Sequence, residues 1–228
     1  LNTDKRISFS ASFGTGAPEG DHPTEMSTAL SRFDSIAVRD KNSQEIVRKV
    51  CGRTAQITVD PTLIYDFVEE SKGKECYGLE PVLLVYSYRQ KPDAIAQTEK
   101  YAKEHNLVID CVGYPPPIRG PRYCQRVDMS CGPFEWVERF ASAHTILTST
   151  FHGVVFSLKF QKPFFFTSCD ASHNRVSSLL DFCGIPHSLQ LAREDETVLF
   201  QPDYNQVTPK LEAAAKASKQ WLLEQLVR

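Results

Sequence analysis

One histidine stands where the sequence predicts a site for chemistry. The stretch from His144 to Ser157, HTILTSTFHGVVFS, begins as a short apolar run typical of a buried strand and then passes through a cluster of hydroxyl residues. Beyond this cluster, apolar residues recur at the spacing of one helical face, so His152 falls in the first turn of a helix that follows a strand. In an open α/β sheet this position binds ligands, because free N–H groups and the positive end of the helix face a crevice.

The residues of this helix start suit an anionic ligand. An imidazole at His152 can hydrogen-bond an anion or transfer a proton near neutral pH. The backbone N–H groups of Phe151 and His152 are suited to phosphate. Thr150 can bind the same anion through its hydroxyl or serve as the N-cap of the helix. For His152 the plainer alternative is a half-buried polar residue that does no chemistry.

A second group of polar residues follows strands nearer the N-terminus. Arg39 ends the apolar run SIAV, and its planar guanidinium can grip a phosphate or carboxylate through two hydrogen bonds. A salt bridge to a neighbouring acid such as Asp40 is the alternative. Ser12 and Gly14 follow an alternating run at residues 6–11 and are expected either to line the same cleft or only to form a turn.

Other polar residues fit structural roles at least as well. Asp60 precedes Pro61, where its carboxylate more simply fixes the turn than acts as a catalytic base. The stretch from residue 114 to 126 holds three consecutive prolines and cannot be a regular element. Its arginines, Arg119, Arg122 and Arg126, either reach an anionic ligand or are solvated.

Strands and helices alternate along almost the whole chain. Apolar runs predict strands at residues 6–11, 35–38, 56–59, 81–88, 107–112, 146–148 and 164–166. Helices are predicted between most of them, one beginning at a capping box of Asn42 and Glu45 and the last beginning at Thr208–Pro209. Such alternation predicts an α/β fold of parallel sheets covered on both faces, built by right-handed crossovers.

Loss of periodicity near residue 75 predicts a boundary between two Rossmann-like domains. We expect a partial first domain at residues 1–75, a complete second domain at 76–205, and a C-terminal helix at 206–228 that packs back across both. The chain has 228 residues, of which 41% are hydrophobic, so there is room for a substantial core.

Composition excludes several classes of function. The formal net charge of −2 gives no bulk attraction to nucleic acid, and no apolar run is long enough to span a membrane. The odd count of seven cysteines argues against a disulfide framework, and Cys124 and Cys131 have no matching histidine pair, so no metal site is expected. Buried thiols and the lack of a signal-peptide pattern lead us to expect a cytoplasmic protein.

Five motifs in a fixed order resemble the polysaccharide pyruvyl transferase family. They are SASFG (residues 10–14), FDSIAVRD (33–40), VDPTL (59–63), GPFEWV (132–137) and TSTFHGVVFSLKFQKPF (148–164). The segment DYNQV (203–207) and the amphipathic run after it also resemble the end of family members. Those members carry a further stretch ahead of the SASFG motif, so the resemblance implies that this chain lacks the N-terminal segment of the first domain.

The resemblance implies a fold like that of the two-domain GT-B glycosyltransferases, with the first domain incomplete. It implies transfer of a carboxyethylidene group from phosphoenolpyruvate, with no further cofactor, to a sugar of an exopolysaccharide or another cell-surface glycan. The acceptor would be a glycan or lipid-linked sugar, and it alone would bring the protein to a membrane.

The resemblance also implies roles for single residues. His152 would be catalytic, and Arg39, Thr150, Phe151, Ser12 and Gly14 would bind the donor in the cleft between the domains. Some members carry an arginine at the position of Thr150, so this chain brings no charge there.

Two alternatives stay open at this point. A nucleotide-sugar glycosyltransferase would have the same two-domain shape, although the glycine-rich loop usual in that class is not found in this sequence. A glycan-binding fragment without catalytic activity is the other alternative, because of the missing N-terminal segment.

Overall fold

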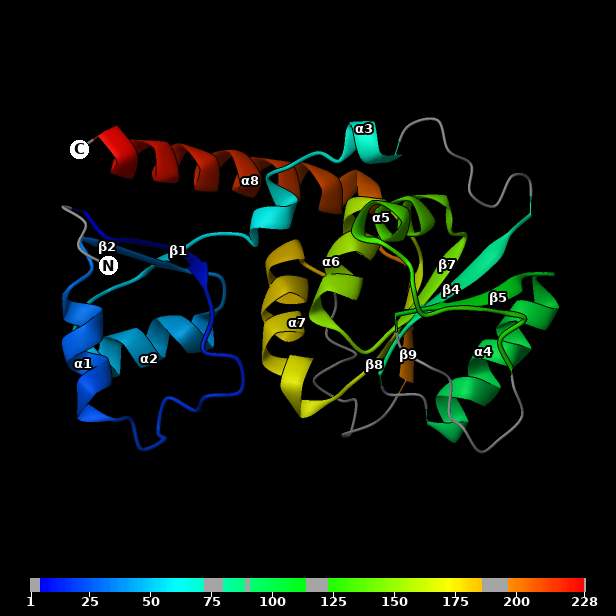
Figure 1. The fold of residues 1–228 in the computed structure, drawn as a ribbon, viewed down its shortest axis with the longest axis horizontal. Coiled ribbons are helices and arrows are strands. Elements are labelled where there is room, and N and C mark those ends of the chain that lie inside the picture. The colour runs from blue at the N-terminus through cyan, green and yellow to red at the C-terminus, as the bar shows by residue number, and fades with distance from the viewer. Residues whose placement is uncertain (1–4, 72–79, 89–90, 114–122, 186–196, 228) are drawn as a thin grey trace.

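The computed structural model describes residues 5–71, 80–88, 91–113, 123–185 and 197–227. Within them the chain forms a mixed α/β fold with two separate sheets, one of three strands and one of six (Figure 1). Every pairing is parallel except the last one in the larger sheet. The α/β class predicted from the sequence is therefore confirmed.

The small sheet has the strand order β1-β2-β3. Its elements are β1 (Ile7–Ala11), α1 (Thr24–Ser31), β2 (Ser35–Val38), α2 (Lys41–Cys51) and β3 (Gln56–Ile57). Its core is small and includes Ile36 and Val38 from β2 and Val47 from α2. Because the strands are parallel, the residues that follow them, Arg39 among them, gather at one edge of the sheet.

The large sheet has the strand order β6-β5-β4-β7-β8-β9. Its strands are β4 (Val82–Tyr86), β5 (Val108–Val112), β6 (Arg126–Asp128), β7 (Thr145–Thr148), β8 (Phe164–Thr167) and β9 (Thr197–Phe200). The chain runs outward from β4 on one side and from β7 on the other, so the order reverses between these two strands. That reversal is the Rossmann switch point, where ligands bind at the carboxyl ends of the strands.

Both faces of the large sheet are buried, as the near-continuous apolar strands require. Ile146, Phe164 and Phe166 point into one core, while Leu147 and Phe165 point into the other, as expected from the two-residue period of strands. The first core is covered by α5 (Pro133–Ser142), α6 (Phe151–Lys159) and α7 (Asp170–Cys183), and the second by α4 (Pro92–Glu104). Two short turns, η1 (Pro61–Leu63) and α3 (Val68–Ser71), follow the small sheet.

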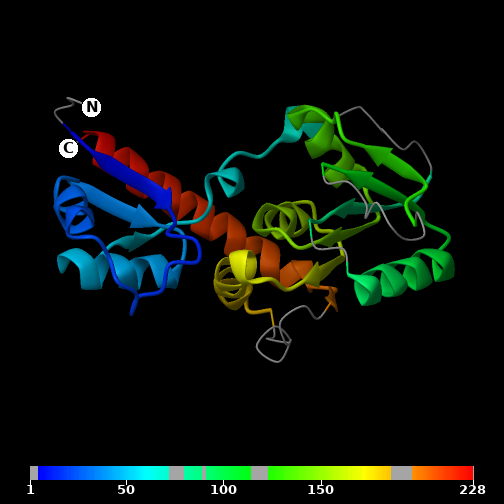
Figure 2. The ribbon, with the colours of Figure 1, turned by 60° about the horizontal axis from the view of Figure 1, so that its bottom comes forward.

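The last helix, α8 (Tyr204–Val227), runs alongside both sheets, as Figures 1 and 2 show. On the large-sheet side, Lys210 Nζ donates to the carbonyl of Cys183 at 3.0 Å. On the small-sheet side, the Ser218 hydroxyl accepts from the Val59 N–H at 3.0 Å, and Gln225 accepts from Ser35 at 2.6 Å. One helix thus holds the two sheets together, while the domain bounds given above stay a prediction.

Several local predictions are wrong. The edge strands β6 and β9 were not expected, and β9 runs antiparallel to β8. The N-cap of α2 is Asp40, whose carboxylate accepts from the Ser43 N–H at 2.7 Å, whereas Asn42 donates to the Gly16 carbonyl. Helix α8 begins before Thr208–Pro209, because Asp203 accepts from the Asn205 N–H and caps the helix there, leaving the proline inside it.

Candidate functional site

Three polar residues that follow three different strands meet between the sheets. Arg39 follows β2, where its N–H donates to the Ala11 carbonyl of β1 at 3.0 Å, and Asp60 follows β3. His152 lies in the first turn of α6, directly after β7 and next to the switch point of the large sheet. The carboxyl ends of both sheets therefore contribute to one cluster, Arg39–Asp60–His152.

Asp60 is the residue that joins this cluster. Its Oδ2 atom accepts from Arg39 Nη1 and lies 3.5 Å from His152 Nε2. The side chain of Asp60 is 2% exposed, that of Arg39 17% and that of His152 47%. A buried carboxylate thus holds one fixed guanidinium and faces an imidazole that reaches solvent.

The other oxygen of Asp60 fixes the local turn. Oδ1 accepts from the Thr62 N–H at 3.1 Å and from the Thr62 hydroxyl at 2.7 Å, which caps the short turn η1. The turn-forming role expected from the sequence is therefore present, but it uses only half of the carboxylate. The other half faces the basic residues of the cluster.

The surroundings of Asp60 keep it ionised. Burial by itself would raise the pKa of this carboxyl, but hydrogen bonds from His152 and Thr62 outweigh burial and hold the pKa far below its ordinary value. The carboxylate is therefore a fixed negative charge at neutral pH. It is suited to orient and stabilise a protonated imidazole rather than to carry a proton itself.

Phe151 contacts basic groups from two parts of the fold. The Arg39 guanidinium carbon is 4.9 Å from the centre of its ring, and that of Arg175 on α7 is 5.6 Å from the same centre. Both are cation–π distances. The buried ring thus positions a guanidinium from the small sheet and another from the large sheet beside the N-terminus of α6.

Thr150 is the N-cap of α6. Its Oγ1 accepts from the Gly153 N–H at 2.9 Å, and the residue is buried. Gly153 packs so tightly on the end of β7 that a side-chain methyl there would overlap the Thr148 hydroxyl. This close packing sets the start of the helix, where the N–H groups of Phe151 and His152 have no carbonyl of a preceding turn to bond.

Ser12 and Gly14 form a turn after β1. The Ser12 hydroxyl accepts from the Gly14 N–H at 3.1 Å, and Gly14 adopts the left-handed conformation, with φ of 62°. The structure shows this local contact for both residues. Their predicted role in donor binding stays a prediction.

The predicted arginine loop is only partly described. Arg119 and Arg122 lie outside the described residues, whereas Arg126 begins the edge strand β6 and forms an ion pair with Glu80. Among the other histidines, His173 bonds to the Ser168 hydroxyl at 2.9 Å within its own helix start. Neither contact connects these residues to the cluster.

Sequence reasoning missed two of these residues, for different reasons. Arg175 lies in the middle of a helix and belongs to no motif, so only the packing of α7 against α6 brings it to Phe151. Asp60 belongs to the VDPTL motif, but because this motif resembles an ordinary turn, the contact of Asp60 with Arg39 and His152 was not predicted. The signal was present in the sequence, since the motif follows a strand end just as Arg39 does.

A cavity of about 400 Å³ adjoins the cluster. It lies between β3 with the residues after it, α7 and α8, and its walls are mainly apolar. Arg39, Asp60 and Phe151 line it. The carboxylate–guanidinium pair of the cluster therefore also forms part of a ligand-sized cavity.

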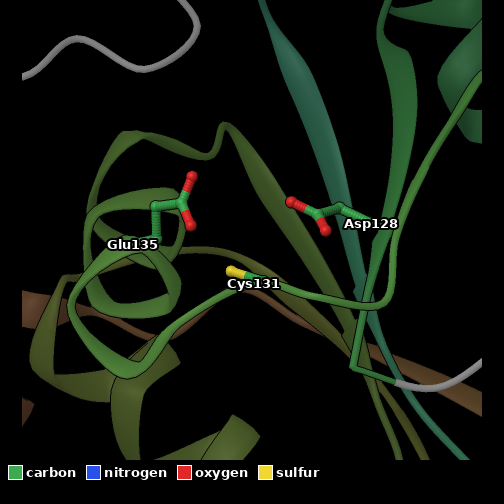
Figure 3. A group of neighbouring side chains, drawn as sticks. All are labelled: Asp128, Cys131 and Glu135. Atoms are coloured by element: carbon green, nitrogen blue, oxygen red, sulfur yellow. The ribbon is translucent and has the colours of Figure 1, made fainter.

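One group of potential metal ligands lies elsewhere in the described part of the chain. The ligand atoms of Asp128, Cys131 and Glu135 lie within 4.8 Å of one another (Figure 3). Asp128 already accepts from Arg139 at 2.7 Å, and burial raises the pKa of the Cys131 thiol to about 11. Because the Asp128 carboxylate is already paired with Arg139, we assign no metal to this group.

The comparisons with known proteins agree with the motif order. The family model described as polysaccharide pyruvyl transferase matches residues 2–171, a span that includes Arg39, Asp60 and His152. The curated proteins and the solved structures contain no significant match. Among the described residues, every helix is too short or too polar to cross a membrane.

Proposed function

This chain belongs to the polysaccharide pyruvyl transferase family, and from that premise we propose which reaction its cluster performs. The donor is phosphoenolpyruvate, and its pyruvyl group is transferred as a carboxyethylidene ketal to two hydroxyls of a sugar in a glycan. The observation that carries this proposal is the convergence of Arg39 and His152 on one oxygen of Asp60, beside the N-terminus of α6.

The donor carries a phosphate and a carboxylate, and the site offers matching donors of hydrogen bonds. The N–H groups of Phe151 and His152 and the positive end of α6 suit the phosphate. Arg39 and Arg175, both within cation–π distance of the Phe151 ring, supply guanidinium groups for the remaining negative charge. The structure thus supports a donor site built from both sheets.

Proton transfer is the task of His152 in this proposal. The reaction begins when an acid protonates the methylene carbon of the enol phosphate, which leaves positive charge on the adjacent carbon. One sugar hydroxyl bonds to that carbon, the carbon–oxygen bond to phosphate then breaks, and the second hydroxyl forms the ketal. Of the two hydroxyl protons, one replaces the proton given to the methylene group and the other leaves on phosphate, so His152 returns to its starting state.

Asp60 positions the imidazole for this task. It is buried and ionised, and its Oδ2 lies 3.5 Å from His152 Nε2. A fixed carboxylate at that distance stabilises the imidazolium form and limits rotation of the ring.

Thr150 acts on the donor only indirectly, because its hydroxyl caps the helix start that binds the donor. We propose that Ser12 and Gly14 line the donor side on the strength of the family motif alone.

The remaining assignments follow from the substrates. The acceptor is proposed to be an exopolysaccharide or lipid-linked sugar, met in the cytoplasm, where any membrane association would come through the acceptor. The reaction itself requires no metal or cofactor besides the donor. Nucleic acid is not proposed as a partner, because the net charge is −2.

Phosphate release tests the proposed reaction. The purified chain is incubated with phosphoenolpyruvate and a panel of oligosaccharides, with phosphate and the mass of the sugar product as readouts. We expect a gain of one carboxyethylidene group on the sugar, and a fall in kcat of roughly 10²- to 10⁴-fold for His152→Gln. His144→Gln is the matched control, because this exposed histidine lies at the opposite end of β7.

Other outcomes would assign a different function. Arg39→Gln is expected to raise the KM for phosphoenolpyruvate, and normal kinetics for both the His152 and Arg39 variants would show that the site is elsewhere. Stabilisation by nucleoside diphosphates but not by phosphoenolpyruvate in thermal unfolding would favour a nucleotide-sugar glycosyltransferase. Sugar binding without turnover would favour a glycan-binding protein.

A further inference from the structure

We infer that the cavity between β3, α7 and α8 binds a pyranose ring of the acceptor. This inference rests on the proposed function, which requires a sugar beside the donor. It names the surface that receives this sugar, which neither the family motifs nor the family match assigns. Four observations carry it: the position of the cavity, its size, the chemistry of its walls and the charges at one side.

The position of the cavity suits a second substrate. Arg39 and Asp60 line it, whereas His152 and Arg175 do not. The Arg39–Asp60 pair is therefore shared between the cavity and the His152 side of the cluster. A donor held at the start of α6 and a sugar held in the cavity would meet at this shared pair, because each would be bound on a different side of it.

The size and walls of the cavity suit a sugar ring. Its volume of about 400 Å³ falls within the range of small-molecule sites. Trp221 of α8 and Phe182 of α7 contribute aromatic rings, and the Phe182 side chain is 47% exposed. A pyranose has an apolar face of C–H groups that packs on such rings, and its hydroxyls need polar partners at the edge of the same wall.

Polar partners lie among the apolar residues. Gln56, Ser178 and Ser218 line the cavity from three different elements. Ser218 accepts from the Val59 N–H, which leaves its own O–H able to donate to a ligand. A few hydroxyl and amide groups on a mainly apolar wall are the pattern that fixes the orientation of an amphipathic ligand.

Other classes of ligand fit less well. An aliphatic chain would need apolar walls throughout, but the charged groups of Arg39 and Asp60 form one side of the cavity. A nucleotide would bring a base and phosphates, whereas none of the described residues that line the cavity is a glycine that would let the backbone approach phosphates closely. We therefore assign the cavity to a sugar, and an aliphatic ligand is an outcome that the experiment must be able to detect.

Trp221 makes binding directly measurable. The chain has two tryptophans, so Trp136→Phe leaves Trp221 as the single fluorescent indole, in the wall of the cavity. This variant is titrated with the methyl glycosides of galactose, mannose and N-acetylmannosamine, and separately with farnesyl phosphate. We expect a saturable change of emission with at least one glycoside. A response to none of the glycosides, or a saturable response to farnesyl phosphate alone, overturns the inference.

Two alanines of α8 provide a matched pair of variants. Ala217 is exposed and lines the cavity, whereas Ala213 is exposed on the same helix and does not line it. Ala217→Leu is expected to weaken glycoside binding at least tenfold, while Ala213→Leu leaves it unchanged. Because both sites are exposed and leucine is a good helix former, neither change is expected to unfold the protein. Equal affinity in the two variants would contradict the assignment of the cavity.

Separate KM values for the sugar and for phosphoenolpyruvate distinguish a failure of this inference from a failure of the proposed function. With an active acceptor, Ala217→Leu should raise the KM of the sugar and leave that of phosphoenolpyruvate unchanged. If turnover occurs but Ala217→Leu has no effect on the sugar, the cavity assignment alone is wrong. If glycosides bind at Trp221 and Ala217→Leu abolishes that binding, the cavity assignment holds even where phosphoenolpyruvate is not a substrate.

Discussion

Two clusters of arginine and aspartate in this molecule have opposite balances of acidic and basic groups. In the large sheet, Arg139 of α5 donates to Asp110 of β5 at 2.9 Å and to Asp128 at the end of β6 at 2.7 Å. Between the sheets, Asp60 faces two basic groups, those of Arg39 and His152. Among the described residues, the first cluster has more acids than bases, since Glu135 also lies 4.0 Å from Arg139, whereas the second has two bases for one acid.

This difference in acidic and basic groups indicates what each cluster can do. Asp110 is fully buried and the Arg139 side chain is 16% exposed, so that cluster is closed and ties the edge strand β6 to the sheet. In the cluster at Asp60, the half-exposed His152 keeps one basic group accessible. Removing one partner of a buried ion pair destabilises the fold, whereas accessible basic groups beside a helix N-terminus attract an anion.

The largest effect on stability is expected where the closed cluster is broken. Arg139→Leu leaves the buried Asp110 carboxylate without this guanidinium, and we expect a loss of about 3–5 kcal/mol in the free energy of unfolding. Urea unfolding followed by circular dichroism measures it. The fraction of protein that folds should keep its KM for the donor, because none of these residues belongs to the proposed donor site.

A surface ion pair provides the control for this prediction. Arg126→Leu removes the exposed arginine that pairs with Glu80, and such pairs contribute only about 0–1 kcal/mol. Similar losses in the two variants would mean that burial of Asp110 does not distinguish them. A large change of donor KM in Arg139→Leu would mean that the closed cluster is not purely structural.

Asp60→Asn is expected to change activity more than stability. The amide keeps the size of the side chain but removes the charge that faces His152 and Arg39. Hydrogen bonds to charged groups contribute about 1.5–3 kcal/mol, so kcat should fall by roughly 10- to 100-fold. Steady-state kinetics across pH measure it, and an unchanged pH profile of kcat would contradict the positioning role.

The stability effect of the same variant should depend on pH. The pKa of Asp60 is lowered in the folded state, so the ionised carboxylate stabilises the fold above its unfolded pKa of about 3.9. This contribution is lost as the pH falls through the lower folded pKa. The difference in unfolding free energy between the wild type and Asp60→Asn should therefore be largest near neutral pH and shrink in acid. A difference that grows in acid would contradict the lowered pKa.

The sequence predicted the members of the cluster better than their connection. Arg39 and His152 were identified because each follows an apolar run that is unmistakably a strand, and strand ends gather at one edge of a parallel sheet. Their link through Asp60 was not predicted, because it depends on how the two sheets are packed. That packing is set by α8, and its contacts with Val59 and Ser35 cannot be predicted from the spacing of apolar residues.

The fold was predicted where strands are apolar and lie inside the sheet. Strands β4, β7 and β8 are buried on both faces and show continuous apolar runs. The missed strands β6 and β9 lie at the two edges of the sheet, where β6 has only three residues, mostly exposed, and the middle of β9 is only half-buried. Arg175 was missed for a third reason, since a long basic side chain on a helix is usually solvated.

The smallest effect is expected at Thr150, which lies beside the Arg39–Asp60–His152 cluster at the start of α6 but whose hydroxyl is already used to cap the helix. Its hydroxyl caps α6 through the Gly153 N–H, and loss of an N-cap costs about 1 kcal/mol. Thr150→Ala should lower the free energy of unfolding by about this amount, whereas Thr150→Ser, which retains the hydroxyl, should lower it less. Urea unfolding of both variants measures the difference.

Kinetics of the same two variants show whether Thr150 is purely structural, like the Arg139 cluster, or binds the donor, as proposed for the cluster at Asp60. If the hydroxyl only caps the helix, the KM for phosphoenolpyruvate should change little in either variant at temperatures where both are folded. A donor KM that rises strongly in Thr150→Ala but not in Thr150→Ser would show that the hydroxyl binds the donor as well. The hydroxyl is buried and already accepts from Gly153, so we expect the first result, with donor binding left to Arg39, Arg175 and the N–H groups that the cap exposes.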